Sequence, residues 1–111
     1  MVSPDGDEVY TATVGGVKLA EPAADLALAL AVAGAARDTA VVPGLVAVGE
    51  VGLAGEIRPV SAIRARLAEA ARLGFTMALV PPHSDANVPQ IRAVEVANVS
   101  DALRCGLPRL S

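Results

Sequence analysis

Residues 45–73, which read LVAVGEVGLAGEIRPVSAIRARLAEAARL, constrain the fold of this chain more than any other stretch. The stretch opens with four apolar residues rich in β-formers, which predicts a short buried strand. Gly49, Gly52 and Gly55 follow at three-residue spacing. Glycine permits the backbone angles of tight turns, so the chain is expected to double back there as a hairpin.

The end of the same stretch predicts a helix. The second arm of the hairpin is expected at residues 57–60, where Pro59 ends the extended run. Ser61 is then expected to cap the helix, because its hydroxyl can accept a hydrogen bond from a backbone N–H of the first turn. Apolar residues recur at helical spacing as far as Gly74, which is expected to end the helix.

The rest of the chain interleaves strand patterns with helix patterns, which predicts an α/β (α+β) fold with a mixed sheet and packed helices. The predicted strands are residues 8–14, 17–19, 75–80 and 91–99, and the predicted helices are residues 23–37 and 101–105, the latter capped by Ser100 and ended by Gly106. In domain terms, residues 1–7 are a flexible lead-in, residues 8–107 form one domain and residues 108–111 are a tail.

Composition excludes several classes of protein. A chain of 111 residues is expected to form one domain. The N-terminus lacks a secretory signal and no apolar run reaches the ~18–20 residues that span a bilayer, so a cytoplasmic protein without membrane contact is expected. The single cysteine, Cys105, cannot form an internal disulfide and is expected to be a semi-buried structural thiol.

Two segments resemble a known family. The run GEVGLAGEIRPVSAIRARLAEAARLGF is similar to the strand, hairpin and helix of Lon proteolytic domains, and closer still to the Lon-like C-terminal domain of the bacterial RadA (Sms) family. Upstream, VGGVKLAEPAADLA resembles a second motif of that family. The two matches together cover roughly residues 9–82.

The resemblance implies a fold and a setting. The fold would be the two-layer arrangement shared by Lon proteolytic domains and the second domain of ribosomal protein S5. The parent would be an ATP-dependent DNA repair and recombination protein, a DNA-dependent ATPase or helicase that assembles as a hexamer on DNA. ATP, Mg and Zn would bind upstream modules, and no cofactor is expected in this fragment. Met1 is accordingly expected to be an introduced start, and the chain to be the C-terminal piece of a longer protein.

The residues at the matching protease positions argue against catalysis. In Lon proteases a serine nucleophile works with a lysine that takes the hydroxyl proton. Aligning the motifs places Ala23 at the serine position and Arg64 at the lysine position. Alanine has no nucleophilic atom, and arginine keeps its proton at any ordinary pH. We therefore expect a degenerate dyad, no catalytic residue and no peptidase activity.

The remaining polar residues that could carry chemistry are expected to have structural roles. Ser61 is expected to be a helix cap and His83 an exposed loop residue. Glu50 and Glu56 flank the glycine hairpin, and a carboxylate or metal site there is left open but not favoured. The alternative function is a peptidase-related or peptide-binding domain with an unorthodox or degenerate site.

Basic residues suggest a contact with DNA. The net charge of −3 and the 2% aromatic content argue against a strong nucleic-acid-binding module. Ion pairs within the predicted helix, with Glu69 as the acid, could absorb part of the basic charge. Repeated around a ring, a weak basic edge could still contact DNA. The candidate contact residues are Lys18, Arg58, Arg64, Arg66 and Arg72.

Overall fold

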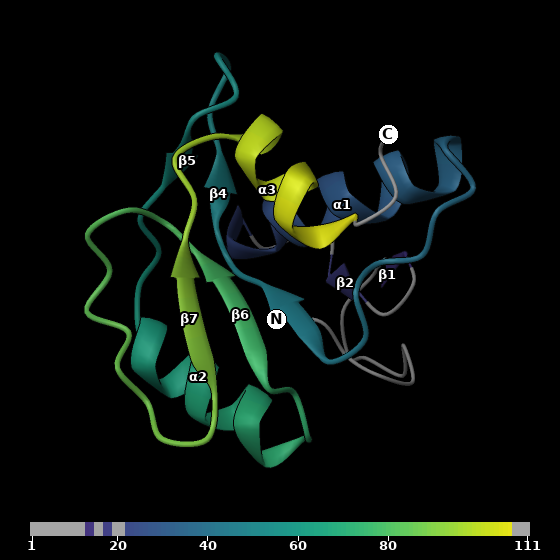
Figure 1. The fold of residues 1–111 in the computed structure, drawn as a ribbon. Coiled ribbons are helices and arrows are strands. Elements are labelled where there is room, and N and C mark those ends of the chain that lie inside the picture. Colours follow the sequence, from purple (N-terminus) through teal and green to yellow (C-terminus); the bar gives the residue numbers. More distant parts are fainter. Residues whose placement is uncertain (1–12, 15–16, 19–21, 108–111) are drawn as a thin grey trace.

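A three-stranded parallel sheet lies at the centre of the computed structural model, which describes residues 13–14, 17–18 and 22–107, with side chains for residues 22–107. The strands lie in the order β3-β6-β7 (Figure 1). Their bounds are Leu45–Ala47 for β3, Met77–Val80 for β6 and Arg92–Glu95 for β7. All three residues of β3 and the last three of β6 are buried. This burial explains why both strands read as continuous apolar runs.

Helices cover both faces of this sheet. Successive side chains of a strand point to opposite faces, so Leu79 and Val80 separate the two layers. Leu79 belongs to the apolar cluster of α1 (Asp25–Ala36) and α3 (Val99–Gly106). Val80 belongs to the cluster of α2 (Ile63–Arg72). The α/β class with packed helices is confirmed, but the helices make three layers instead of the two that the resemblance implied.

The glycine-rich hairpin forms as predicted. Its arms are β4 (Glu50–Val51) and β5 (Ile57–Arg58), which pair antiparallel. Gly55 has a φ of 84°, and its N–H donates to the Gly52 carbonyl at 2.9 Å. Parallel and antiparallel pairing therefore both occur in this domain.

A second antiparallel pair lies in the N-terminal part of the chain. It consists of β1 (Thr13–Val14) and β2 (Val17–Lys18). These four residues fall within the predicted strands at residues 8–14 and 17–19. The rest of those two predictions, the lead-in and the tail lie outside the described residues.

Both predicted serine caps are wrong. The residue before α2 is Ala62, with a φ of 56°, and no side chain caps that end. At α3 the cap is Asn98, whose Oδ1 accepts from the Asp101 N–H at 2.8 Å. Ser100 instead lies inside the first turn of α3.

The two glycines predicted to stop helices have different roles. Gly74 follows α2 with a φ of 101°, as the prediction requires. Gly106 is the last residue of α3 and is buried against α1. A Cβ at Gly106 would lie 2.9 Å from Leu30 Cδ2 and 3.3 Å from Leu45 Cδ2. Gly106 therefore permits the close approach of α3 to α1 and β3.

The start of α1 is fixed to the end of β3. A 3₁₀ turn, Pro22–Ala24, leads into α1. The Gly49 N–H donates to the Ala23 carbonyl, and the Leu26 N–H donates to the Gly49 carbonyl, both at 3.0 Å. The Asp25 carboxylate accepts from the Val51 N–H at 3.2 Å. The helix, β3 and the hairpin are thus joined at one point.

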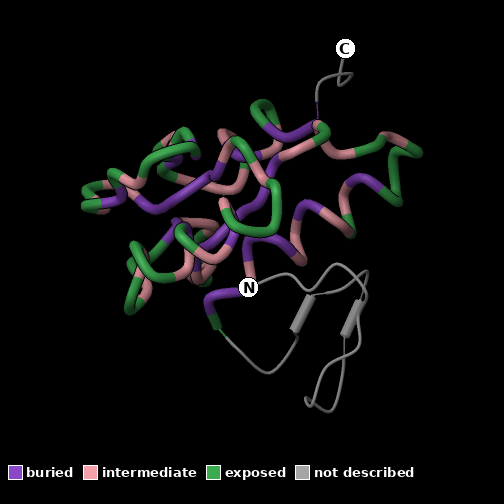
Figure 2. Tube along the Cα trace, turned by 90° about the horizontal axis from the view of Figure 1, so that it is seen from below, coloured by how far each residue is buried: buried purple, intermediate pink, exposed green. Residues whose placement is uncertain are grey.

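Burial follows this arrangement. In Figure 2 the buried parts of the trace run through the sheet and the inner sides of the helices, while the exposed parts lie at the turns and on the outer sides of the helices. Leu53 at the tip of the hairpin and Val32 on α1 are large apolar side chains that remain exposed. None of the helices in the described ranges combines the length and the apolarity needed to cross a bilayer.

Replacing Asp25 tests the junction. Asp25→Ala removes the acceptor of the Val51 N–H and should lower the free energy of unfolding by about 1–2 kcal/mol. Asp25→Asn keeps an oxygen acceptor and should retain most of that stability. Urea denaturation of the three proteins measures both effects, and equal losses in the two variants would contradict the role assigned to this hydrogen bond.

Candidate functional site

A small pocket lies beside Ala23, at the meeting point of the 3₁₀ turn, β4 and the segment after β5. Its volume is about 190 Å³. Ala23 is 4% exposed, so the wall at this point is backbone and a methyl group. The lining residues are Pro22, Ala23, Glu50, Pro59, Val60, Ser61 and Arg66.

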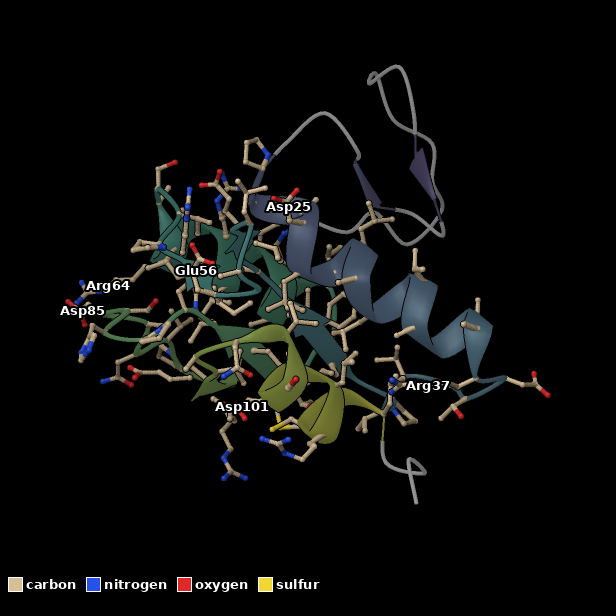
Figure 3. The ribbon with its side chains drawn as sticks, turned by 90° about the horizontal axis from the view of Figure 1, so that it is seen from above. Asp25, Arg37, Glu56, Arg64, Asp85 and Asp101 are labelled. Atoms are coloured by element: carbon tan, nitrogen blue, oxygen red, sulfur yellow. The ribbon has the colours of Figure 1, made fainter. Side chains whose placement is uncertain are left out.

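Arg64 does not line this pocket. Its Nε donates to the Asp85 carbonyl at 3.1 Å, and its guanidinium also binds the Asp85 carboxylate. Figure 3 shows Arg64 and Asp85 turned toward one another at the edge of the molecule, away from Asp25. Two residues along a helix correspond to a rotation of about 200°, so Arg66 faces the pocket when Arg64 faces the loop. The side chain of Arg64 is therefore directed to Asp85 and away from the pocket beside Ala23.

Arg64 ties α2 to a loop that lies far from it along the chain. Asp85 follows Arg64 by 21 residues and belongs to the segment between β6 and β7. The hydrogen bond and the charge of Arg64 lower the pKa of the Asp85 carboxyl, so this group is ionised at neutral pH. Both side chains are more than half exposed. The pair consequently fixes the position of the loop more than it adds to the free energy of unfolding.

Glu56 has its partners within the hairpin. Its carboxylate accepts from the Ala54 N–H at 3.0 Å and from Arg58 at 2.9 and 3.1 Å. A hydrogen bond from its own backbone N–H, followed by the bond from Arg58, lowers the pKa of Glu56. Glu50 lies opposite Arg58 in the strand register and lines the pocket. Within residues 22–107 no three His, Cys, Asp or Glu side chains gather as metal ligands.

The arginines predicted to contact DNA are engaged with neighbouring groups. Arg58 pairs with Glu56 and Arg64 with Asp85. Arg72 Nε donates to Glu69 at 3.0 Å, which confirms the expected pairing within α2. Arg66 Nε donates to the Ser61 carbonyl at 2.8 Å. The fifth candidate, Lys18, lies in β2, and its side chain is outside the described residues.

Three other residues weighed from the sequence are exposed. Ser61 lines the pocket near Ala23 and does not cap α2. His83 lies in the loop after β6, as predicted, with a φ of 60°. Cys105 is exposed, so the expectation of a semi-buried thiol is wrong. Sequence reasoning missed Asp85, because nothing in the local pattern pairs it with Arg64.

Comparisons with known proteins identify relatives over most of the chain. The family model for subunit ChlI of Mg-chelatase matches residues 15–84. DNA repair protein RadA of Mycobacterium tuberculosis is 47% identical over 88% of this chain and 20% of its own length. The Bacillus subtilis protein of that name is 44% identical over 90% of this chain and 22% of its own length. The Escherichia coli protein is 48% identical over 86% of this chain and 21% of its own length.

These matches show which part of its relatives the chain covers. It spans about a fifth of the length of the curated relatives it matches. The matched part includes the hairpin, α2 and the pocket near Ala23. The chain therefore belongs to the family of bacterial RadA proteins, of which it represents one segment that also matches the ChlI family.

Proposed function

We propose that this chain is a non-catalytic scaffold domain of a RadA-type DNA repair protein. Support for the repair role comes from its relatives, which are named DNA repair protein RadA. The observation that carries the non-catalytic part is the pairing of Arg64 with Asp85. An arginine held by a carboxylate on the far side of α2 from the pocket cannot act as the base of a Ser-Lys dyad.

The chemistry at Ala23 supports the same proposal. A methyl group stands where a Lon protease has its nucleophile, and the backbone of Ala23 is occupied by the bond to Gly49. The position serves packing, because Ala23 belongs to the apolar cluster on the α2 side of the sheet. A domain in which Ala23 and Arg64 both have structural roles fits a scaffold that supports a hexameric ring.

The activity of the full-length protein is also part of the proposal. We take the full-length protein to be a DNA-dependent ATPase or helicase of repair and recombination that works in the cytoplasm. ATP, Mg and Zn would be bound by segments outside this chain. The domain itself would contribute contacts between subunits and a weak contact to DNA.

A second candidate function rests on the pocket beside Ala23. Three polar residues, Ser61, Glu50 and Arg66, are among those that line this small cavity. A degenerate protease domain that still binds peptides would use such a cavity. A fluorogenic peptide or casein assay tests for an active peptidase: the scaffold proposal expects no hydrolysis, and hydrolysis that Ser61→Ala abolishes would favour the enzyme. Binding of casein peptides that Ser61→Ala weakens, without hydrolysis, would favour the degenerate peptide-binding domain.

Self-association is the first test of the scaffold. Light scattering over a range of protein concentrations gives the solution mass of the chain. We expect a mass that rises with concentration toward a hexamer, because a scaffold domain must contact its neighbours. A mass that stays at that of a monomer at all concentrations would contradict assembly through this domain.

The DNA contact is tested with the arginines in the assembled protein. Phosphates must displace the carboxylates that hold Arg58, Arg64 and Arg72, so binding should be weak and should fall steeply with salt. Arg64→Ala combined with Arg66→Ala should weaken binding to single- and double-stranded DNA and should reduce the salt slope by about one unit for each phosphate that is no longer neutralised. Arg37→Ala is the control, since Arg37 lies at the far end of α1. Unchanged binding in the double variant would remove DNA contact from the proposal and leave the scaffold.

A further inference from the structure

The outer side of β7 is an open sheet edge. β7 pairs with β6 on its inner side, where the Arg92 N–H donates to the Thr76 carbonyl and the Val96 N–H donates to the Val80 carbonyl, both at 2.9 Å. In a parallel pair alternate residues bond to the same neighbour. The backbone groups of Ala93 and Glu95 therefore point away from β6, and among the described residues no strand pairs with them.

Just beyond Glu95, the same edge is paired with β5. The Ile57 N–H of β5 donates to the Ala97 carbonyl at 3.0 Å, and Glu56 forms an antiparallel bridge with Asn98. β5 ends at Arg58, and Pro59 follows, which has no N–H to donate. The chain then turns into α2. An antiparallel partner strand thus begins along this edge and stops short of Glu95 and Ala93.

A groove of about 410 Å³ lies beside the open stretch. One wall is β7, with Arg92, Ala93 and Glu95, and the other is the loop that contains Ser84, Asp85 and Asn87. This volume is in the range of pockets that hold small ligands. Unpaired main-chain donors and acceptors along one wall select an extended backbone over a compact molecule.

The loop wall is held in place at several points. Ser84 Oγ donates to the Pro81 carbonyl at 2.7 Å, and Val88 bridges Ile91. Ala86 is only 6% exposed. Arg64 binds both the carbonyl and the carboxylate of Asp85. The groove is therefore preformed, which limits the entropy that a bound segment would have to overcome.

Charge indicates what kind of segment fits. Arg92 and Glu95 are exposed, and neither forms an ion pair with another described residue. They lie three residues apart and so point to opposite faces of the sheet. In an added antiparallel strand, a basic residue would lie opposite Glu95, and an acidic residue three positions later would lie opposite Arg92.

We propose that the outer edge of β7 and its groove bind an extended peptide segment as an added antiparallel strand, with a basic residue three positions before an acidic one. The segment continues the line that β5 leaves at Pro59. This site is separate from the pocket beside Ala23, and the proposal does not depend on the scaffold function. The charges that select this segment also disfavour indiscriminate pairing of the edge.

The first measurement uses two peptides, Ac-KVTEVTGC-NH2 and its charge-swapped counterpart Ac-EVTKVTGC-NH2, each with fluorescein on the cysteine. Their first residue lies opposite Glu95, so that neither peptide overlaps the place of β5 beside Ala97. Fluorescence anisotropy at low salt with the whole chain should show saturable binding of the first peptide with Kd below about 1 mM. The swapped peptide should bind about fivefold more weakly, since two favourable cross-strand pairs become unfavourable. Absence of saturable binding of the first peptide would overturn the proposal.

Backbone methylation of the first peptide tests the pairing itself. N-methylation of the threonine before the glutamate removes the N–H that would face Ala93, and should abolish binding. N-methylation of the valine after the lysine alters an N–H that would face solvent, and should leave most of the affinity. Equal effects at the two positions would exclude strand addition.

A charge exchange in the protein completes the test. The double variant Arg92→Glu with Glu95→Lys should reverse the preference, so that the swapped peptide binds about fivefold better. Arg37→Glu is the matched control, because Arg37 is also exposed and without an ion pair to another described residue. An unchanged preference in the double variant would overturn the assigned register.

Arg64 is the positioning residue of the groove. Arg64→Ala frees the loop wall and should weaken the first peptide several-fold, with the far-ultraviolet circular dichroism spectrum unchanged. Arg72→Ala is the control, because Arg72 pairs with Glu69 within α2 and touches no loop of the groove. Equal affinities of the two variants would contradict the role given to Arg64.

Discussion

The exchange of backbone hydrogen bonds between Gly49 and the residues around the start of α1 holds this domain together. Gly49 accepts from Leu26 and donates to Ala23, which fixes the helix to the end of β3. β5 also approaches Gly49 closely, since a Cβ at Gly49 would lie 2.7 Å from Ile57 Cγ2. Ile57 in turn donates to Ala97 beyond β7. One glycine thus connects the helix, the hairpin and the end of the third strand.

This junction also explains why Ala23 is a structural position. Its carbonyl is committed to Gly49, and its side chain is buried among the residues that face α2. Arg64 is likewise committed, through Asp85, to holding a loop. The pocket beside Ala23 is therefore lined by the side chain of Arg66, while the side chain of Arg64 is held at Asp85.

The features that sequence predicted well depend on local chemistry. The apolar run at residues 45–48, the glycines of the hairpin and the stop at Gly74 each follow from the backbone freedom or burial of a few neighbouring residues. The two serine caps were predicted wrongly because a neighbouring residue takes the position at the start of each helix. Ser61 and Ser100 have the right chemistry for caps, but Ala62 turns the chain before α2 and Asn98 takes the cap of α3.

The site was harder to predict than the fold. The partner of Arg64 lies 21 residues further along the chain, and no periodic pattern links the two. The continuous apolar runs of β3 and β6 are typical of strands covered on both faces, but they do not show which helix lies on which face. The open edge of β7 could not be read from residues 91–99 either, since it exists only because β5 ends at Pro59.

The parallel sheet has a kinetic consequence. β3 and β6 are separated by the hairpin and α2, and β6 and β7 by the loop that carries Asp85, so no pair in this sheet can form by closing a simple turn. The chain must overcome loop-closure entropy before these strands gain their contacts, which slows folding. The hairpin and α2 have local contacts and can form early. The connection between β6 and β7 is shorter than that between β3 and β6, so the β6–β7 pair should close first. The side of β6 that later receives β3 is then exposed to other nascent chains until β3 is added.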